Sequence, residues 1–275
     1  FHCCRRTQTN PVRELTFLCV QCQVWSYCDQ DCQARHQKLH KLECNNVAAL
    51  LDKCRAVDMP PFKGLLVYRS ALQYQEQEWK ELLELESHRD LHLAHNPDYA
   101  DKARAVAHWM LEQNLVPGVD QDTLVGIFFR ININAIGLGS EGVGLFPGTP
   151  SMLNHSCNEN VTHHWNKGRL WFRACERIEN GNACCISYVS KLEQPTTERT
   201  AALFHYKFFQ CQCPRCQSPD EQGRAEATVE WRALLETLSK GTCNDTIAIY
   251  QRLVELAELL FPPYFVTKGW ALEEC

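Results

Sequence analysis

The uneven spacing of its cysteines constrains this chain more than any other feature. Seventeen of the 275 residues are cysteine, and most of them fall into two groups, one before residue 45 and one at residues 211–216. The sequence has no apolar run of about 18 residues and no charged leader followed by an apolar segment. We therefore expect a soluble protein of the cytoplasm and nucleus. In such reducing compartments, clustered cysteines favour metal ligation over disulfides.

The first cysteine group has the ligand spacing of a zinc-binding module. It contains three close pairs of candidate ligands: Cys19 and Cys22, Cys28 and Cys32, and His40 and Cys44. A separation of four positions, as in the last two pairs, places both side chains on one side of a helix. Paired thiolates and imidazoles at these spacings can close tetrahedral sites around Zn²⁺.

The order of these ligands resembles a MYND zinc finger. The resemblance implies an interleaved arrangement in which one ion is held by Cys19, Cys22, His40 and Cys44. A second ion is then held by Cys3, Cys28 and Cys32, with a fourth ligand expected before Phe1, so that the chain would start inside the finger. His36 lies in the same segment, and we expect its side chain to face away from His40 into solvent.

A second constellation occupies the other half of the chain. It consists of Asn154-His155-Ser156-Cys157, the segment 181–188 that ends in Tyr188, and Cys211-Gln-Cys213-Pro-Arg-Cys216. Together these motifs resemble a SET-domain lysine methyltransferase with its cysteine-rich post-SET segment. With a MYND-like finger in front, the chain resembles the SET-and-MYND (SMYD) family up to about Cys216. The helices beyond resemble the start of that family's tetratricopeptide-like domain.

This resemblance implies an S-adenosylmethionine site and a third zinc ion. Tyr188 corresponds to the catalytic tyrosine, with a strand tyrosine of purely structural role as the alternative. The implied cofactor contacts are Asn134 on an expected strand, Asn154, His155, and Phe209, which would stack on adenine unless Phe208 takes that role. Glu86 and His88 are further candidates, with an exposed helix face as the alternative. The third Zn²⁺ is assigned to Cys157, Cys211, Cys213 and Cys216.

The apolar pattern predicts an α+β fold. Helical periodicity predicts helices over 72–88 and 101–115 and two more after Cys216, whereas β-branched and aromatic runs predict strands over 128–138 and 170–174. The expected domains are a MYND finger (1–44), a helical insert (45–125), a SET core (126–190), a post-SET segment (191–220) and the start of a helical C-terminal domain (221–275).

Three positions depart from the pattern of the resembled family. Glu159 replaces a proline, Asn182-Ala183 replaces an acidic pair, and Ile136 replaces an aromatic residue. We expect a looser or differently shaped lysine channel as a result. The family's Gly-x-Gly turn, which contacts the methionine end of the cofactor, would precede Phe1.

The implied function is methyl transfer to lysines of a histone or another protein. A different class of function is a catalytically inactive scaffold. It would bind proteins through the finger, which the resemblance associates with proline-rich peptides, and through the acidic C-terminal helices. The net charge is −5 and the basic residues are scattered, so nucleic acid is not an expected partner. Binding of S-adenosylmethionine separates these two hypotheses.

Overall fold

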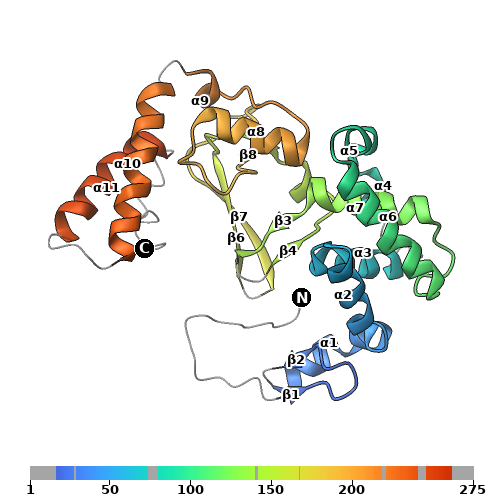
Figure 1. Cartoon of the computed structure of the whole chain (residues 1–275). Helices are drawn as coiled ribbons and strands as arrows, with labels where there is room; N and C mark the ends of the chain where they lie inside the picture. The colour runs from blue at the N-terminus through green and yellow to red at the C-terminus, as the bar shows by residue number, and fades with distance from the viewer. Residues whose placement is uncertain are drawn as a thin grey trace. The chain divides into compact units, whose positions relative to one another are not determined.

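The computed structural model divides the chain into two compact units. It describes residues 17–27, 29–73, 80–139, 142–166, 168–218, 221–240 and 246–261. The first unit comprises Phe1–Met152 and His164–Trp171, and the second comprises Leu153–His163 and Phe172–Cys275. Within the described residues, none of the helices combines the length and the apolar character that a membrane span requires. Figure 1 shows the elements of both units.

The first unit begins with a small cysteine-rich region. Strands β1 (Phe17–Leu18) and β2 (Ser26–Tyr27) pair antiparallel and are followed by helix α1 (Gln30–Glu43). The helix starts where it does because the carboxylate of Asp29 accepts a hydrogen bond from the backbone N–H of Cys32 at 2.7 Å, a typical N-cap contact. The cap therefore fixes the first turn of the helix that carries several candidate metal ligands.

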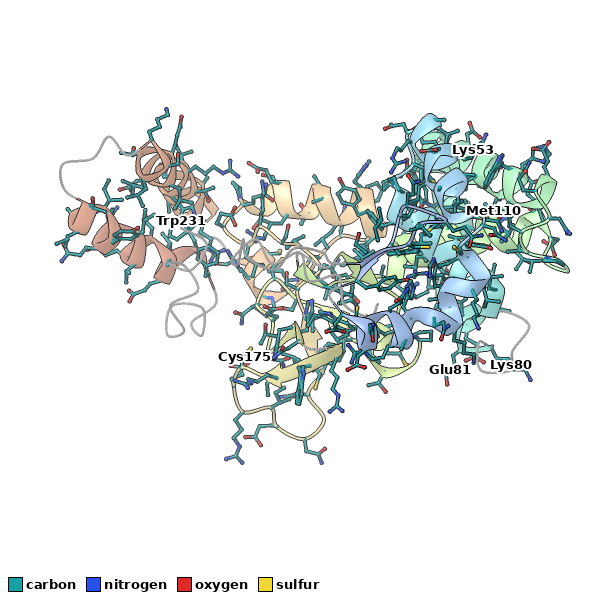
Figure 2. The ribbon with its side chains drawn as sticks, turned by 90° about the horizontal axis from the view of Figure 1, so that it is seen from below. Lys53, Lys80, Glu81, Met110, Cys175 and Trp231 are labelled. Atoms are coloured by element: carbon teal, nitrogen blue, oxygen red, sulfur yellow. The ribbon has the colours of Figure 1, made fainter. Side chains whose placement is uncertain are left out.

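Six helices form the main core of the first unit (Figure 1). They are α2 (Val47–Ala56), α3 (Pro61–Gln73), α4 (Lys80–Glu84), α5 (Arg89–His95), α6 (Pro97–Glu112) and α7 (Gln121–Asn134). Met110 of α6, labelled in Figure 2, is fully buried in this core with Leu50, Val67 and Phe128. The predicted helix over 101–115 is confirmed, and it begins earlier because Pro97 occupies the first turn, where its missing N–H costs nothing.

Two of the predictions for this unit were wrong. Of the helix predicted over 72–88, residues 74–79 lie outside the described residues. Its end is not helical, because α4 stops at Glu84 and His88 has a left-handed φ of 46°. The strand predicted over 128–138 is mostly helix, since α7 runs to Asn134 and only Ile136–Gly137 forms a strand. Helix α7 is buried on nearly every side, so its apolar run lacks the polar interruptions that distinguish a helix from a strand.

Short strands and a 3₁₀ turn complete the first unit. Strand β3 (Ile136–Gly137) pairs antiparallel with β4 (Val143–Gly144), and the turn η3 (Thr149–Met152) follows. The longer hairpin of β6 (Val161–Asn166) and β7 (Arg169–Ala174) has its tip in this unit and its base in the second unit. The strand predicted over 170–174 is confirmed by β7.

The second unit joins a parallel strand pair to a set of helices. Strand β5 (Asn154–His155) pairs parallel with β8 (Cys185–Ile186), although 29 residues separate the strands in the chain. The helices are α8 (Thr196–Lys207), α9 (Pro214–Gln217), α10 (Glu221–Ser239) and α11 (Thr246–Leu260). The two helices predicted after Cys216 are confirmed by α10 and α11, which bury Trp231 (Figure 2) against Leu253 and Leu256.

Candidate functional site

Four candidate ligands of the first cysteine group converge at the end of helix α1. The ligand atoms of Cys19, Cys22, His40 and Cys44 all lie within 4.8 Å of one another. The Sγ atoms of Cys19 and Cys44 are 3.8 Å apart, and Sγ of Cys22 is 3.4 Å from Nε2 of His40. Thiolates bound to one Zn²⁺ at about 2.3 Å lie about 3.8 Å apart in a tetrahedron. We call these four residues the finger cluster, and its spacing fits a zinc ion.

The protonation of the finger cluster suits metal binding. Burial lowers the pKa of His40, so its imidazole is neutral, which is the form that ligates a metal. Burial and the hydrogen bond that the Cys44 thiol makes to Cys19 raise the pKa of Cys44 to about 11. A metal ion would have to displace this thiol proton, so binding releases protons.

The other predicted finger ligands are only partly within the described residues. Cys3 and Cys28 lie outside them, so the structure gives no geometry for a second ion. Cys32 is fully buried and is not part of the finger cluster. The ligand set Cys3, Cys28 and Cys32 therefore stays a prediction.

The expectation that His36 is solvated was wrong. Its side chain is buried, and its ring stacks on that of His40 with centroids 5.5 Å apart and planes 4° from parallel. Residues one helical turn apart share a face of the helix, so the i, i+4 spacing that joins His40 to Cys44 also joins it to His36. The spacing was the signal that could have identified His36.

A second cluster of thiols lies in the second unit. The Sγ atoms of Cys157, Cys211, Cys213 and Cys216 lie within 4.8 Å of one another, and those of Cys157 and Cys216 are 3.6 Å apart. We call these residues the tetrathiolate cluster. Hydrogen bonds among the thiols raise the pKa of Cys157 and lower the pKa of Cys213. The donor set and the spacing both fit a zinc ion held by four sulfurs.

A buried arginine that the sequence analysis missed contacts the tetrathiolate cluster. Arg199 of α8 is fully buried, and its guanidinium donates to Sγ of Cys157 at 3.4 Å and to Sγ of Cys216 at 3.7 Å. A buried cation is costly unless it is paired. Four thiolates around Zn²⁺ would carry a net charge of −2, which Arg199 would partly compensate if the cluster holds the ion. No local sequence pattern marks Arg199, because the contact depends on tertiary packing.

Three aromatic rings gather beside the tetrathiolate cluster. The ring centroid of His155 is 5.3 Å from that of Tyr188 and 5.8 Å from that of Phe209, and the rings of Tyr188 and Phe209 are 6.3 Å apart. Phe208, the alternative to Phe209, instead ends helix α8 in a left-handed conformation and is buried. The geometry therefore favours Phe209 as the stacking ring.

His155 links Tyr188 to the tetrathiolate cluster. The backbone N–H of Tyr188 donates to Nδ1 of His155 at 2.9 Å, and Nε2 of His155 lies 3.3 Å from Sγ of Cys157. Burial lowers the pKa of His155 to about 4, so the ring is neutral and its single proton is on Nε2, facing the sulfur. One imidazole thus joins the candidate catalytic residue to a candidate metal ligand.

Glu159, noted in the sequence as a departure, also holds the Tyr188 segment. Its carboxylate is buried and accepts the backbone N–H of Ser187. The side chain of Tyr188 donates to the backbone carbonyl of Leu153, and burial raises the pKa of Tyr188, so the phenol is neutral. Side chains on both sides of Cys157 therefore fix the backbone that carries the tyrosine.

The remaining predicted cofactor residues are divided between the units. Asn154 lies on β5 opposite Cys185, with its side chain exposed. In the first unit, Asn134 is the last residue of helix α7, so its expected strand was wrong, and its amide donates to the backbone carbonyl of Glu86 at 2.8 Å. Glu86 and His88 lie between α4 and α5 and not on a helix face, and the Glu86 carboxylate accepts the backbone N–H of His88. The structure thus joins these three residues locally.

Comparison with known proteins identifies related sequences over most of the chain. The SET domain family matches residues 9–189. N-lysine methyltransferase SMYD2 from Bos taurus is 26% identical over 245 residues, which cover 86% of this chain and 55% of the relative. Histone-lysine N-methyltransferase SMYD3 from Homo sapiens is 30% identical over 247 residues, which cover 83% of this chain and 55% of the relative. The chain therefore spans about half the length of the curated relatives that it matches.

Proposed function

This chain belongs to the SET domain family, and we propose that it is an S-adenosylmethionine-dependent protein-lysine N-methyltransferase. The substrates would be lysines of histones or of other proteins. The resemblance to the SET-and-MYND family that the motifs predicted is confirmed by the similarity to SMYD2 and SMYD3.

One observation carries the proposal beyond family membership. Tyr188, His155 and Phe209 come from three separate segments, yet they form one aromatic group. That group is tied through His155 to a cluster of four thiols with zinc spacing. A protein that used the SET region only as a scaffold would not require this group and this link together.

The residues of this group suit S-adenosylmethionine. The partly exposed ring of Phe209 offers a face on which adenine can stack. His155 is neutral because burial lowers its pKa to about 4, so it does not repel a cationic sulfonium. Asn154 precedes His155 on β5 and is exposed, so its amide is accessible to a ligand. Contributions of Glu86, His88 and Asn134 to cofactor binding stay a prediction.

The cofactor would supply an electrophilic methyl group on a positively charged sulfur, and the chain would orient and desolvate the substrate. Free lysine has a pKa of about 10.4, and an apolar environment beside a positive charge lowers it, so the amine can lose its proton to solvent. Tyr188 keeps its proton because burial raises its pKa. Its hydroxyl can therefore hold the neutral amine in line with the methyl group.

We propose the domain organisation predicted from the sequence. It consists of a MYND finger (1–44), a helical insert (45–125), a SET core (126–190), a post-SET segment (191–220) and the start of a tetratricopeptide-like domain (221–275). The finger and tetrathiolate clusters, with their zinc spacing, support the first and fourth assignments. The protein would act in the cytoplasm and nucleus.

The catalytic proposal is tested with calorimetry and a peptide-array methylation assay. S-adenosylmethionine should bind, and the chain should methylate lysine peptides. Tyr188→Phe should lower the rate by about 100-fold or more, because one oriented hydroxyl is lost, while cofactor binding changes little. Equal rates for the variant and the native chain would refute the role of Tyr188. Absence of cofactor binding by the folded full-length protein would refute the proposed enzymatic activity.

A scaffold function remains the second candidate because of a hollow beside the finger cluster. The hollow has a volume of about 610 Å³, and glutamine side chains contribute to its lining, among them Gln21, Gln33 and Gln37. Glutamine amides can donate hydrogen bonds to the backbone carbonyls that an extended proline-rich peptide leaves without internal partners. Titration of a proline-rich peptide into the chain, with and without S-adenosylmethionine, would show whether the two activities coexist.

A further inference from the structure

A series of hydrogen-bonded, mostly buried side chains extends from Nδ1 of His40, on the side of the ring opposite the finger cluster. Nδ1 of His40 lies 3.0 Å from the hydroxyl of Tyr27, and the same hydroxyl lies 3.0 Å from Nδ1 of His36. Nε2 of His36 lies 3.3 Å from the carboxylate of Glu43. Arg69 of helix α3 is the last member of this series, because its Nε and Nη2 each donate to one oxygen of Glu43 at 2.7 Å.

All the members beyond His40 are nearly inaccessible to solvent. Tyr27 is 1% exposed, His36 5%, Glu43 0% and Arg69 7%. Buried polar groups of this kind need partners inside the protein, because water is not there to provide them. Arg69 also lies 4.9 Å from the ring of Trp25, a cation–π contact that fixes the guanidinium on its other side.

Metal binding at Nε2 of His40 would fix the direction of each hydrogen bond in this series of side chains. If Nε2 of His40 ligates the metal, then the proton of the neutral ring must be on Nδ1 and must point to the Tyr27 oxygen. The Tyr27 hydroxyl then donates to Nδ1 of His36. The proton of His36 is consequently on Nε2, where it donates to Glu43, which Arg69 keeps ionised.

The same contacts also permit the opposite direction. Nη2 of Arg69 lies 3.3 Å from Nε2 of His36 and can donate to it. The proton of His36 would then be on Nδ1 and would point to Tyr27, whose hydroxyl would donate to Nδ1 of His40. His40 would carry its proton on Nε2, 3.4 Å from the Cys22 sulfur, and could not ligate a metal through that atom.

We propose that Tyr27, His36, Glu43 and Arg69 form a relay that positions the imidazole of His40, and that metal binding at the finger cluster reverses the relay's hydrogen bonds. The four are positioning residues, because none of them touches the metal. Partners that orient a ligating histidine in this way also raise its basicity. The relay crosses the predicted boundary between finger and helical insert, so it couples metal occupancy to helix α3. This inference rests on the proposed metal at the finger cluster.

The direct test is the tautomer of His36 in the native chain. Long-range ¹H–¹⁵N correlation spectra distinguish a proton on Nδ1 from one on Nε2. The relay predicts Nε2–H for His36 when Zn²⁺ is bound and Nδ1–H after the metal is removed with a chelator. The same tautomer in both states would overturn the reversal, and Nδ1–H with zinc bound would overturn the relay itself.

A second test measures metal affinity with a matched control. Tyr27→Phe removes the central hydroxyl, and cadmium affinity of the finger cluster should fall about 10- to 100-fold. In ¹¹³Cd spectra, a site with three thiolates and an imidazole is distinguished from an all-thiolate site, so the two clusters are followed separately. Tyr68→Phe is the control, because Tyr68 is equally buried but bonds only outside the relay, to the Leu42 carbonyl and the Asn46 amide.

The outcomes separate failure of the relay from failure of the metal site. If native protein binds no metal at the finger cluster, the proposed metal site and the relay both fail. If it binds metal and the two phenylalanine variants have equal affinities, only the relay fails. If Tyr27→Phe does not fold, the tautomer of His36 in the native chain still decides.

Discussion

The finger cluster and the tetrathiolate cluster place their imidazoles differently. In the finger cluster His40 is one of the four candidate ligands. Two further side chains, those of Tyr27 and His36, connect it to the charged pair of Glu43 and Arg69. In the tetrathiolate cluster all four groups are thiols, and His155 points its Nε2 at the sulfur of Cys157 from outside.

The difference follows from charge. With Zn²⁺, three thiolates and a neutral imidazole carry −1, whereas four thiolates carry −2. The more negative cluster receives direct N–H donors from Arg199 and His155. The finger cluster is less negative, so orientation of its imidazole matters more than neutralisation of its charge. His155 also connects the tetrathiolate cluster to Tyr188, because Nε2 of His155 lies near the Cys157 sulfur and Nδ1 accepts the backbone N–H of Tyr188.

The largest expected effect comes from removing a ligand of one cluster at a time. Cys157→Ser deletes a metal ligand and leaves the donors of Arg199 and His155 without their sulfur, so S-adenosylmethionine binding should be lost. Cys44→Ser deletes a candidate ligand of the finger cluster, none of whose four residues belongs to the aromatic group of His155, Tyr188 and Phe209, and should leave cofactor binding within about threefold. Calorimetry on both variants, with metal content measured in parallel, checks this contrast. Equal losses in both would remove the distinction between the clusters.

Removing the arginine should have the next largest effect. Arg199→Met keeps much of the side-chain volume but removes the N–H donors to two thiolates, so metal affinity of the tetrathiolate cluster should fall about 10- to 100-fold. Arg199→Lys should recover part of the loss, because it restores the charge without the planar fork.

The control for this variant is another arginine of the same unit. Arg232→Met removes an arginine that is half exposed and pairs with Glu198 on the surface. Its effect on metal affinity should be negligible, because exposed ion pairs contribute little. An Arg199→Met variant that binds metal as tightly as the Arg232→Met variant would argue against charge compensation.

The smallest effect is expected at the backbone beside Tyr188. Glu159→Gln keeps an acceptor for the Ser187 N–H but removes the charge that strengthens the bond. The kcat of the proposed methyl transfer should fall roughly tenfold, with metal content unchanged. Glu179→Gln is the matched control, because Glu179 is exposed and its carboxylate pairs with Arg177 on the surface. Unchanged kcat in Glu159→Gln would mean that His155 alone positions the tyrosine segment.

Much of the site was predictable from the sequence because its spacing is local. Within each of two ligand pairs, Cys19 with Cys22 and His40 with Cys44, the residues are only three or four positions apart. The motif from Asn154 to Cys157 resembles that of a known family. The structure brings the predicted thiols of both clusters together. The C-terminal helices were predictable for a similar reason, since one face of each is apolar and the other is polar.

The features of the fold and of the site that could not be predicted from the sequence depend on tertiary contacts. Helix α7 was predicted as a strand because burial on nearly every side removes the polar positions that reveal a period. Arg199 and Arg69 have ordinary sequence neighbourhoods, and their importance comes from partners 42 and 26 residues away. The i, i+4 spacing relates His36 to His40, but the burial of His36 also depends on Tyr27, which comes from another element.

The central claim is that the tetrathiolate cluster, and not the finger cluster, maintains the cofactor site. It is tested most directly by removing ¹¹³Cd stepwise with a chelator from the cadmium-loaded protein while S-adenosylmethionine binding is measured on the same samples. The account predicts that cofactor binding disappears in step with the all-thiolate resonance of this cluster and does not follow the resonance of the finger cluster. Cofactor binding that persists after the tetrathiolate cluster has lost its metal would contradict it.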